Sequence, residues 1–215
     1  FAGFGAGIKA IFPGLGQAAA IRINHRLKSE PGARAGVVDG NPCRDDLAAA
    51  VAMIEAPIFL VNGVCAPDAS IQAVVAGNVA RAFHVGVELA RPWFSVSARP
   101  APLVIASDAL PVSASLYQAA KIAAAAAPLV SADGELVIVA ECPDGIGPLE
   151  TVNEAIFRIG VLPRLAPGVR VSLLSSLPSE SVARTLVRFT SVLPPIDRHT
   201  LVLPRASQLI CGAIS

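Results

Sequence analysis

The second half of the chain alternates short apolar runs with helix-like stretches, and this alternation limits the folds open to it. Four runs rich in Val, Leu and Ile have the length of strands, at 103–106, 136–139, 169–174 and 200–203. Helices are predicted between them, at 114–127, 151–159 and 179–192. Strands that are apolar throughout are typical of parallel sheets covered by helices. We therefore predict an α/β domain with a mostly parallel sheet flanked by helices.

The first 96 residues are less regular. Helices are predicted at 17–27, 44–54 and 79–89, and strands at 58–64 and 71–76. Pro92-Trp93 and the Pro-rich stretch 98–102 predict a linker, so we place a domain boundary between residues 97 and 98. The chain begins at Phe1, inside a glycine-rich turn and without Met. We expect the C-terminal part of a longer polypeptide.

Composition narrows the class of protein. Hydrophobic residues make up 53% and charged residues 15%, which favours a sizeable core over disorder. The net charge is +1 and the basic residues are scattered, so nothing indicates a nucleic-acid or anionic membrane partner. The longest apolar run is too short to span a bilayer. Four widely spaced cysteines, without a CxxC pair, are typical of buried thiols in a cytoplasmic protein.

A glycine-rich turn precedes Lys9, with Gly3, Gly5 and Gly7 at alternate positions. The spacing matches neither the GxGxxG dinucleotide pattern nor a P-loop. Glycines still allow backbone N–H groups to approach a phosphate closely. The commoner outcome for so weak a signal is an ordinary tight turn beside a surface lysine.

His25 lies on the helical stripe of Ala18 and Ile21, and a lone histidine on such a face is usually a hydrogen-bonded core residue. A metal site normally needs several ligands, and no second His, Cys or carboxylate stands at a useful spacing. If His25 binds a metal, the remaining ligands must come from something other than protein.

Two further features fall in the second half. Tyr117, Gln118 and Lys121 stand at the start of an Ala-rich helix, where Lys121 either extends to water or is desolvated for proton chemistry or anion binding. The loop 141–147 follows a strand directly, and ligands bind at the carboxyl ends of parallel strands. This loop is therefore a candidate rim of a site; the alternative is a turn held by Asp144.

The order of these motifs along the chain resembles that of the nickel-dependent lactate racemase family, a group of 2-hydroxy acid racemases and epimerases. The resemblance covers nearly the whole chain, which corresponds to the C-terminal portion of such a protein. The motifs that carry it are the Gly-rich turn with Lys9, Phe12-Pro13-Gly14, Asn24-His25, Gly36, Asn41-Pro42, Asp45, Phe59-Leu60-Val61-Asn62, Ala76-Gly77-Asn78, Leu116 to Lys121, and Ala140-Glu141-Cys142-x-Asp144-Gly145.

The resemblance implies a nickel-pincer nucleotide, the pyridinium-3-thioamide-5-thiocarboxylic acid mononucleotide, with Ni held by one ring carbon and two sulfur atoms. Lys9 matches the lysine joined to this cofactor through a thioamide, and His25 matches the protein ligand of the metal. Gly5, Gly7 and Asn24 complete the expected cofactor-binding set. Three donors from the cofactor and one imidazole suit four-coordinate Ni(II). Residues 1–97 are then part of an α/β cofactor-binding domain.

The same resemblance implies a hydride relay between the cofactor and a 2-hydroxy acid, with Lys121, Gln118 and Tyr117 as catalytic residues. The family's two acid/base histidines are expected upstream of Phe1, so we predict that these 215 residues alone are inactive. Cofactor-synthesis proteins are the implied partners. Departures at Ala82-Phe83 and at the short loop 108–111, and the absence of a late Trp, leave the acid itself open. A non-catalytic cofactor-binding module, an inactive paralogue or a structural fragment are the alternatives.

Overall fold

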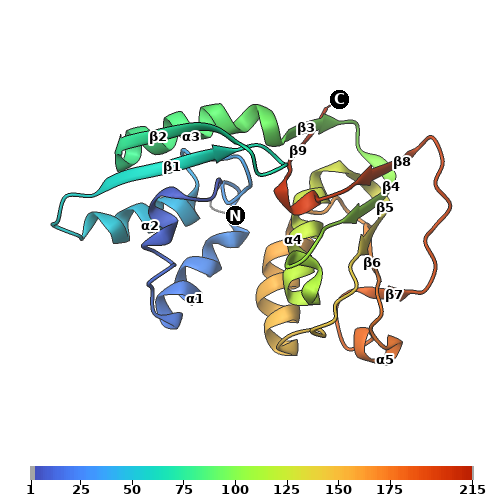
Figure 1. Ribbon diagram of the computed structural model, residues 1–215. Helices are drawn as coiled ribbons and strands as arrows, with labels where there is room; N and C mark the ends of the chain where they lie inside the picture. Colours follow the sequence, from blue (N-terminus) through green and yellow to red (C-terminus); the bar gives the residue numbers. More distant parts are fainter. Residues whose placement is uncertain (1–2, 215) are drawn as a thin grey trace. The chain divides into compact units, whose positions relative to one another are not determined.

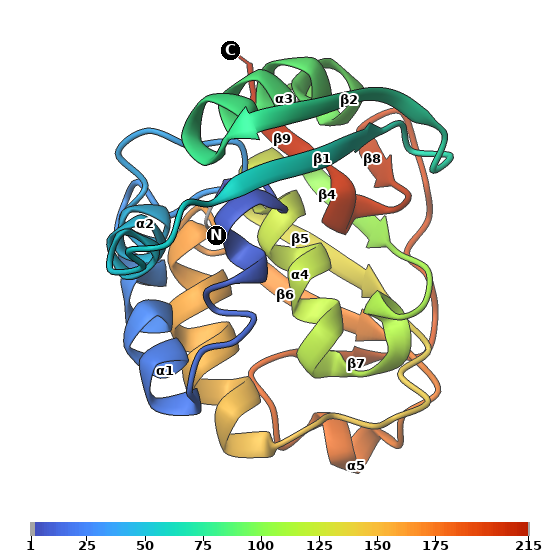
Figure 2. The same cartoon turned by 60° about the vertical axis from the view of Figure 1, so that its left-hand side comes forward.

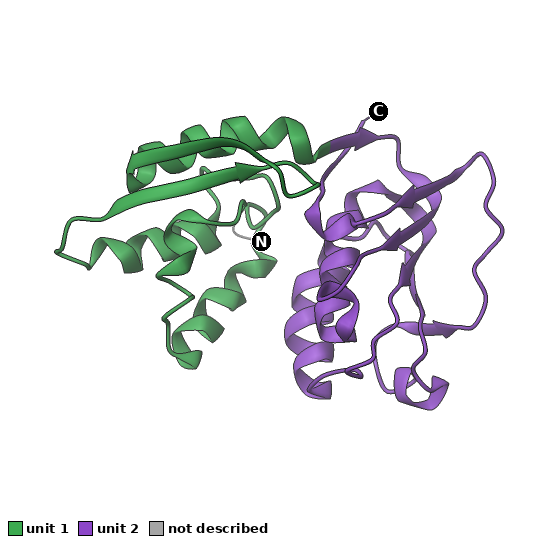
Figure 3. Cartoon of the chain, in the orientation of Figure 1, with its two compact units in different colours: residues 1–95 green, residues 96–215 purple. Residues whose placement is uncertain are grey.

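The computed structural model describes residues 3–214. The chain separates into two compact units, Phe1–Ser95 and Val96–Ser215, which are described one at a time (Figure 3). Among the described residues, no helix has both the length and the apolar character that crossing a membrane requires.

The second unit is built on a five-stranded parallel sheet (Figure 1). Its strands run in the order β7-β6-β5-β4-β8, and every neighbouring pair is parallel. This confirms the predicted α/β class. The strands are β4 (Ala101–Ser107), β5 (Val130–Val139), β6 (Arg170–Leu174), β7 (Arg188–Thr190) and β8 (Thr200–Leu203). A separate two-stranded sheet joins β3 (Ser95–Ala98) to β9 (Ile210–Ala213).

Helices flank this sheet. The main ones are α4 (Leu116–Ala126) and η5 (Thr151–Val161), a widened helix with i→i+5 hydrogen bonding (Figure 2). Ile122 of α4 and Phe157 of η5 are completely buried in one core with Leu136 and Ile138 of β5. The short helices of this unit are η3 (Val112–Ala114), η4 (Ala127–Leu129), η6 (Leu162–Arg164), α5 (Ser179–Val182) and η7 (Ala206–Gln208).

The predicted helix at 179–192 is wrong beyond its first turn. The helix α5 ends at Val182, and residues 188–190 form β7, which pairs in parallel with β6. Val187, Phe189 and Thr190 are residue types that favour strands, and Val187 is buried in the core. Pairing with an existing strand edge therefore outweighs the helical signal of the first turn.

The first unit contains a hairpin and three α-helices. The hairpin pairs β1 (Phe59–Cys65) with β2 (Ile71–Asn78) in antiparallel fashion, and α3 (Val79–Phe94) packs on it over Val64 and Val75. The remaining helices are η1 (Gly7–Ala10), α1 (Ala18–Arg26), η2 (Leu27–Ser29) and α2 (Pro42–Ala52). A small core of Ile8, Leu47 and Val51 joins η1 to α2.

Two smaller predictions need correction. Residues 92–93 lie inside α3, and β3 and β4 take up most of the stretch at 95–107, so no irregular linker occurs there. Pro92 has no N–H to donate to the carbonyl four residues earlier, and α3 ends two residues after it, at Phe94. Of the four cysteines, Cys65 is exposed and Cys211 half-buried, so only Cys43 and Cys142 are the buried thiols expected.

Candidate functional site

Lys9 lies in η1, a single 3₁₀ turn, where its side chain is half-buried. The two nearby glycines have different surroundings. Gly7 has φ 62°, and a Cβ added there would lie 2.6 Å from the Phe83 ring, so packing alone requires glycine. Gly5 is exposed, and a Cβ there would meet nothing within 4 Å. The backbone at Gly5 is therefore open to close approach by another molecule.

His25 lies in the last turn of α1, half-buried. Its Nδ1 atom is buried and has no hydrogen-bond partner among residues 3–214. Burial, followed by the charge of Lys28, lowers the pKa of His25 to about 4, against the opposing effect of the Ile21 carbonyl, with which Nδ1 forms no well-aligned hydrogen bond. The imidazole is therefore neutral at pH 7, which is the form that binds metals.

Lys9 and His25 are electrostatically coupled. The positive charge of Lys9 contributes to the lowered pKa of His25, so its ammonium lies within electrostatic reach of the ring. This is the smallest of the effects on that pKa, and it links two residues that the sequence separates by sixteen positions. Among the described residues, no group of three or more His, Cys, Asp or Glu side chains could hold a metal ion.

Asn24 is 5% exposed and joins α1 to α2. Its Nδ2 donates to the Cys43 carbonyl at 2.9 Å and to Asp46 Oδ2 at 2.9 Å. These bonds fix the last turn of α1, and with it the orientation of His25. The structure therefore gives Asn24 a positioning role, and its two N–H donors are already used.

The second group of predicted residues lies on α4, in the other unit. Ser115 caps this helix by accepting from the Gln118 N–H, which places Tyr117 and Gln118 in its first turn. Lys121 is exposed, and its Nζ donates to Gln118 Oε1 at 2.6 Å. Of the two alternatives for Lys121, the structure shows the one in which the ammonium reaches water.

The loop 141–147 lies against the start of α4. The carbonyls of Gly145 and Ile146 accept from the N–H groups of Leu116 and Tyr117, at 3.1 and 3.0 Å. The loop follows β5, and α4 follows β4, so both stand at the carboxyl ends of adjacent parallel strands. Ligands bind at this edge in open α/β sheets. The predicted rim and the predicted helix are therefore neighbours.

Two cysteines can be set aside as reactive groups. Burial raises the pKa of Cys142, in the loop 141–147, to about 11, and that of Cys211 to about 11. Thiols with raised pKa values are poor nucleophiles and poor metal ligands at neutral pH. Neither thiol is therefore suited to act as a nucleophile or a metal ligand at neutral pH.

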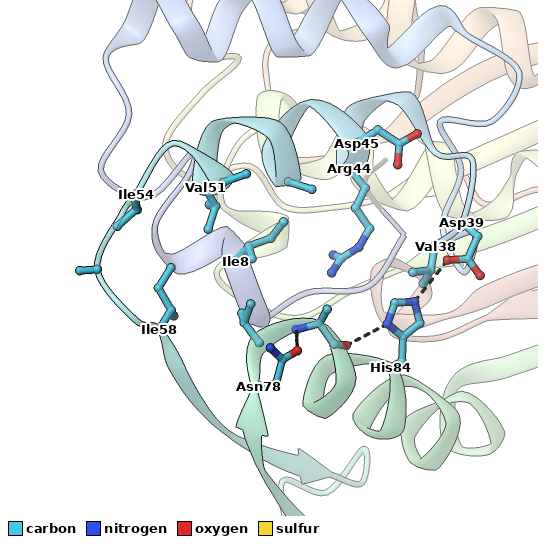
Figure 4. A pocket seen from close by; sticks show the side chains of 15 residues that line it. Ile8, Val38, Asp39, Arg44, Asp45, Val51, Ile54, Ile58, Asn78 and His84 are labelled. Atoms are coloured by element: carbon cyan, nitrogen blue, oxygen red, sulfur yellow. Dashed lines mark hydrogen bonds and ion pairs between the residues drawn. The ribbon is translucent and has the colours of Figure 1, made fainter.

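Sequence reasoning missed one feature of the first unit, a cavity of about 460 Å³ into which the buried Arg44 side chain points (Figure 4). Asn41-Pro42 marks the start of α2, but nothing in the local pattern shows that Arg44 faces inward. Periodicity would place an arginine on the solvent side of a helix. Neither Lys9 nor His25 lines this cavity.

Comparison with known proteins gives two curated relatives. The chain is 33% identical over 150 residues to the lactate racemase of Thermoanaerobacterium thermosaccharolyticum and 30% identical over 150 residues to that of Lactiplantibacillus plantarum. Each alignment covers 68% of this chain and 35% of the relative. The chain therefore spans about a third of the length of the curated relatives it matches. No protein-family profile matches it.

Solved structures show the same fold. The lactate racemase apoprotein from T. thermosaccharolyticum superposes with a TM-score of 0.82 and 23% identity, over 100% of this chain and 60% of that one. A structural-genomics protein from Thermotoga maritima superposes with a TM-score of 0.64 and 16% identity, over 83% and 55% of the two chains. With two curated relatives at 30–33% identity and this shared fold, the chain belongs to the lactate racemase family.

Proposed function

We propose that the chain is part of a racemase or epimerase of a 2-hydroxy acid that carries a nickel-pincer nucleotide on Lys9. The observation that carries the proposal is the buried Nδ1 atom of His25, which has no partner among the described residues and lies within reach of the charge of Lys9. In a chain related to lactate racemases, this pair is where a lysine tether and a single protein ligand would stand.

The residues present fit this cofactor. Lys9 would hold it through a thioamide, and the neutral imidazole of His25 would supply the one protein donor to nickel. Soft donors from the cofactor with one imidazole suit square-planar Ni(II).

When bound, the cofactor supplies an acceptor and donor for the hydride on the α-carbon of the substrate. The chain's own contribution to substrate binding would come from α4. The Lys121 ammonium, oriented by its hydrogen bond to Gln118, is suited to pair with a substrate carboxylate or to stabilise a developing alkoxide. Tyr117 is held in place by the loop 141–147 beside them.

Proton transfer needs further groups. Of the chain's histidines other than His25, His84 is bound to Asp39 and His199 to Arg198. We therefore infer that the acid/base histidines come from a part of the protein outside these 215 residues, which alone would show no turnover. Cytoplasmic cofactor-synthesis proteins would be the partners that load Lys9.

The proposed hydride transfer is tested by following the hydrogen on C2 of the substrate. In a longer form of the protein loaded with cofactor, a 2-hydroxy acid deuterated at C2 should racemise in ordinary water and keep its label. Lys121→Ala should lower kcat/KM at least about a hundredfold, whereas His199→Gln, an exposed position on a loop, should leave it unchanged. Exchange of the label with water, or full activity in Lys121→Ala, would contradict these roles.

A further inference from the structure

The cavity in the first unit lies between α2 and the start of α3 (Figure 4). Most of its wall is apolar, with Ile8, Val51 and Ile58 among the contributors. Its volume, about 460 Å³, falls in the range of small-molecule sites. The polar and charged residues that line it are Asp39, Arg44, Asp45, Asn78 and His84.

Arg44 is the buried charge of this cavity. The residue is 8% exposed, and its Nη1 atom is buried without a hydrogen-bond partner among residues 3–214. None of the ion pairs formed within the described part of the chain includes it. A buried donor without a partner is costly, because Nη1 has lost its water without gaining an acceptor. An anion bound in the cavity would remove that cost.

Phe83 determines how such an anion can approach. The guanidinium carbon lies 3.5 Å from the centroid of the Phe83 ring, so one face of the cation is covered by the ring. Guanidinium N–H groups donate along the in-plane edges of the group, which the ring does not cover. A planar carboxylate meets this edge with two parallel hydrogen bonds, a geometry that lysine could not offer.

The other charges favour a monoanion over a dianion. Asp39 and Asp45 are exposed at the rim, and Asp39 is held by His84 at 3.2 Å. Burial lowers the pKa of Arg44 against the opposing charges of Asp45 and Asp39, and the guanidinium stays charged because the ordinary pKa of arginine is so high. Two nearby carboxylates would repel a phosphate dianion more strongly than a single carboxylate. The apolar wall needs a hydrocarbon to fill it.

We propose that Arg44 and this cavity form a binding site for a carboxylate carried on an apolar stem. The carboxylate could belong to a small organic acid or to an acidic side chain of a protein segment outside these 215 residues. The site is separate from Lys9 and His25, and the inference does not depend on the nickel cofactor.

The experiment is a calorimetric titration with octanoate at constant ionic strength. Octanol and inorganic phosphate serve as comparison probes, the first lacking the charge and the second lacking the stem. The variants are Arg44→Met and, as a control that removes an exposed positive charge from α1, Arg22→Met. Ala48→Phe fills the cavity from α2 and leaves Arg44 in place. Circular dichroism on each variant confirms that it is folded.

Octanoate should bind the parent and Arg22→Met equally, and at least about tenfold more weakly to Arg44→Met and Ala48→Phe. Octanol and phosphate should each bind the parent at least about tenfold more weakly than octanoate. Equal octanoate affinity in folded Ala48→Phe or Arg44→Met, no saturable octanoate binding to the parent, or phosphate binding as tight as octanoate would overturn the proposal. The same titration of a longer form of the protein distinguishes the two sources of the carboxylate. If octanoate still binds, the natural ligand is a small organic acid; if octanoate no longer binds, an acidic side chain of the added segment occupies the cavity.

Discussion

His25 combines a half-buried ring with a strongly lowered pKa, and this has a consequence for stability. The unfolded chain takes up a proton on this ring near pH 6.5, whereas the folded chain resists it down to about 4. The unfolded state therefore binds more protons between these two pH values. The contribution of the His25 ring to the free energy of unfolding is complete above about pH 6.5 and is lost as the pH falls toward 4.

Urea unfolding from pH 7 to pH 4 measures this effect. The parent should lose stability steadily through that window, and His25→Gln should lose less, because the other titrating groups, the carboxylates and His84 among them, are common to both proteins. Identical slopes for the two proteins would mean that His25 titrates normally when folded.

Gly7 and Gly5 form a matched pair for testing the turn around Lys9. Gly7→Ala would place a methyl group 2.6 Å from the Phe83 ring at a φ of 62°, and should destabilise the fold by about 1–3 kcal/mol. Gly5→Ala meets nothing within 4 Å and should change the free energy of unfolding by less than about 0.5 kcal/mol. Chemical denaturation of both variants decides this. Equal losses would show that the turn is not packed against Phe83.

At the scale of elements, α1 is fastened to α2 by the Asn24 side chain. Asn24→Ala would leave the Cys43 carbonyl and Asp46 without this donor. In cofactor-free protein it should lower the free energy of unfolding by about 1–3 kcal/mol. The measurement is the free energy of unfolding of cofactor-free parent and variant. An unchanged stability, combined with lost cofactor binding, would instead make Asn24 a direct contact of the cofactor.

Elements with a strong local signal could be predicted, and those decided by tertiary contacts could not. The apolar runs that became β4, β5 and β6 are largely buried, and β8 is apolar although it lies at the sheet edge, so composition alone predicts these strands. The strand β7 is three residues long and exists because β6 offers it an edge. Similarly, α3 continues past Pro92, where the sequence favoured a break.

At the scale of the molecule, the second unit has a core of its own. Its buried cluster, which includes Leu116, Phe157 and Leu173, belongs wholly to residues after 95. Residues 95–215 expressed alone should therefore unfold in one cooperative transition, with protected amides in β4 and β5. A broad, non-cooperative thermal transition would show that this unit needs the first one to fold.

The candidate site could be predicted only from motifs spread over the chain. Taken singly, the turn at Lys9 and the histidine on α1 each favoured an ordinary structural role, because neither carries enough ligands or glycines for a known local pattern. Their interaction depends on the tertiary fold and shows only in the small effect of the Lys9 charge on the pKa of His25. The burial of Arg44 could not be predicted from the sequence, because arginine is rarely buried without a partner.

The central claim is that Lys9 tethers a nickel cofactor for which His25 is the protein ligand. Intact-mass spectrometry, with nickel analysis, of the longer protein produced together with the cofactor-synthesis proteins tests it most directly. The parent and Lys121→Ala should both carry the adduct and nickel, Lys9→Ala should carry no adduct, and His25→Ala should keep the adduct and lose most of the metal. A parent without adduct and without nickel, or an adduct that survives Lys9→Ala, would contradict the claim.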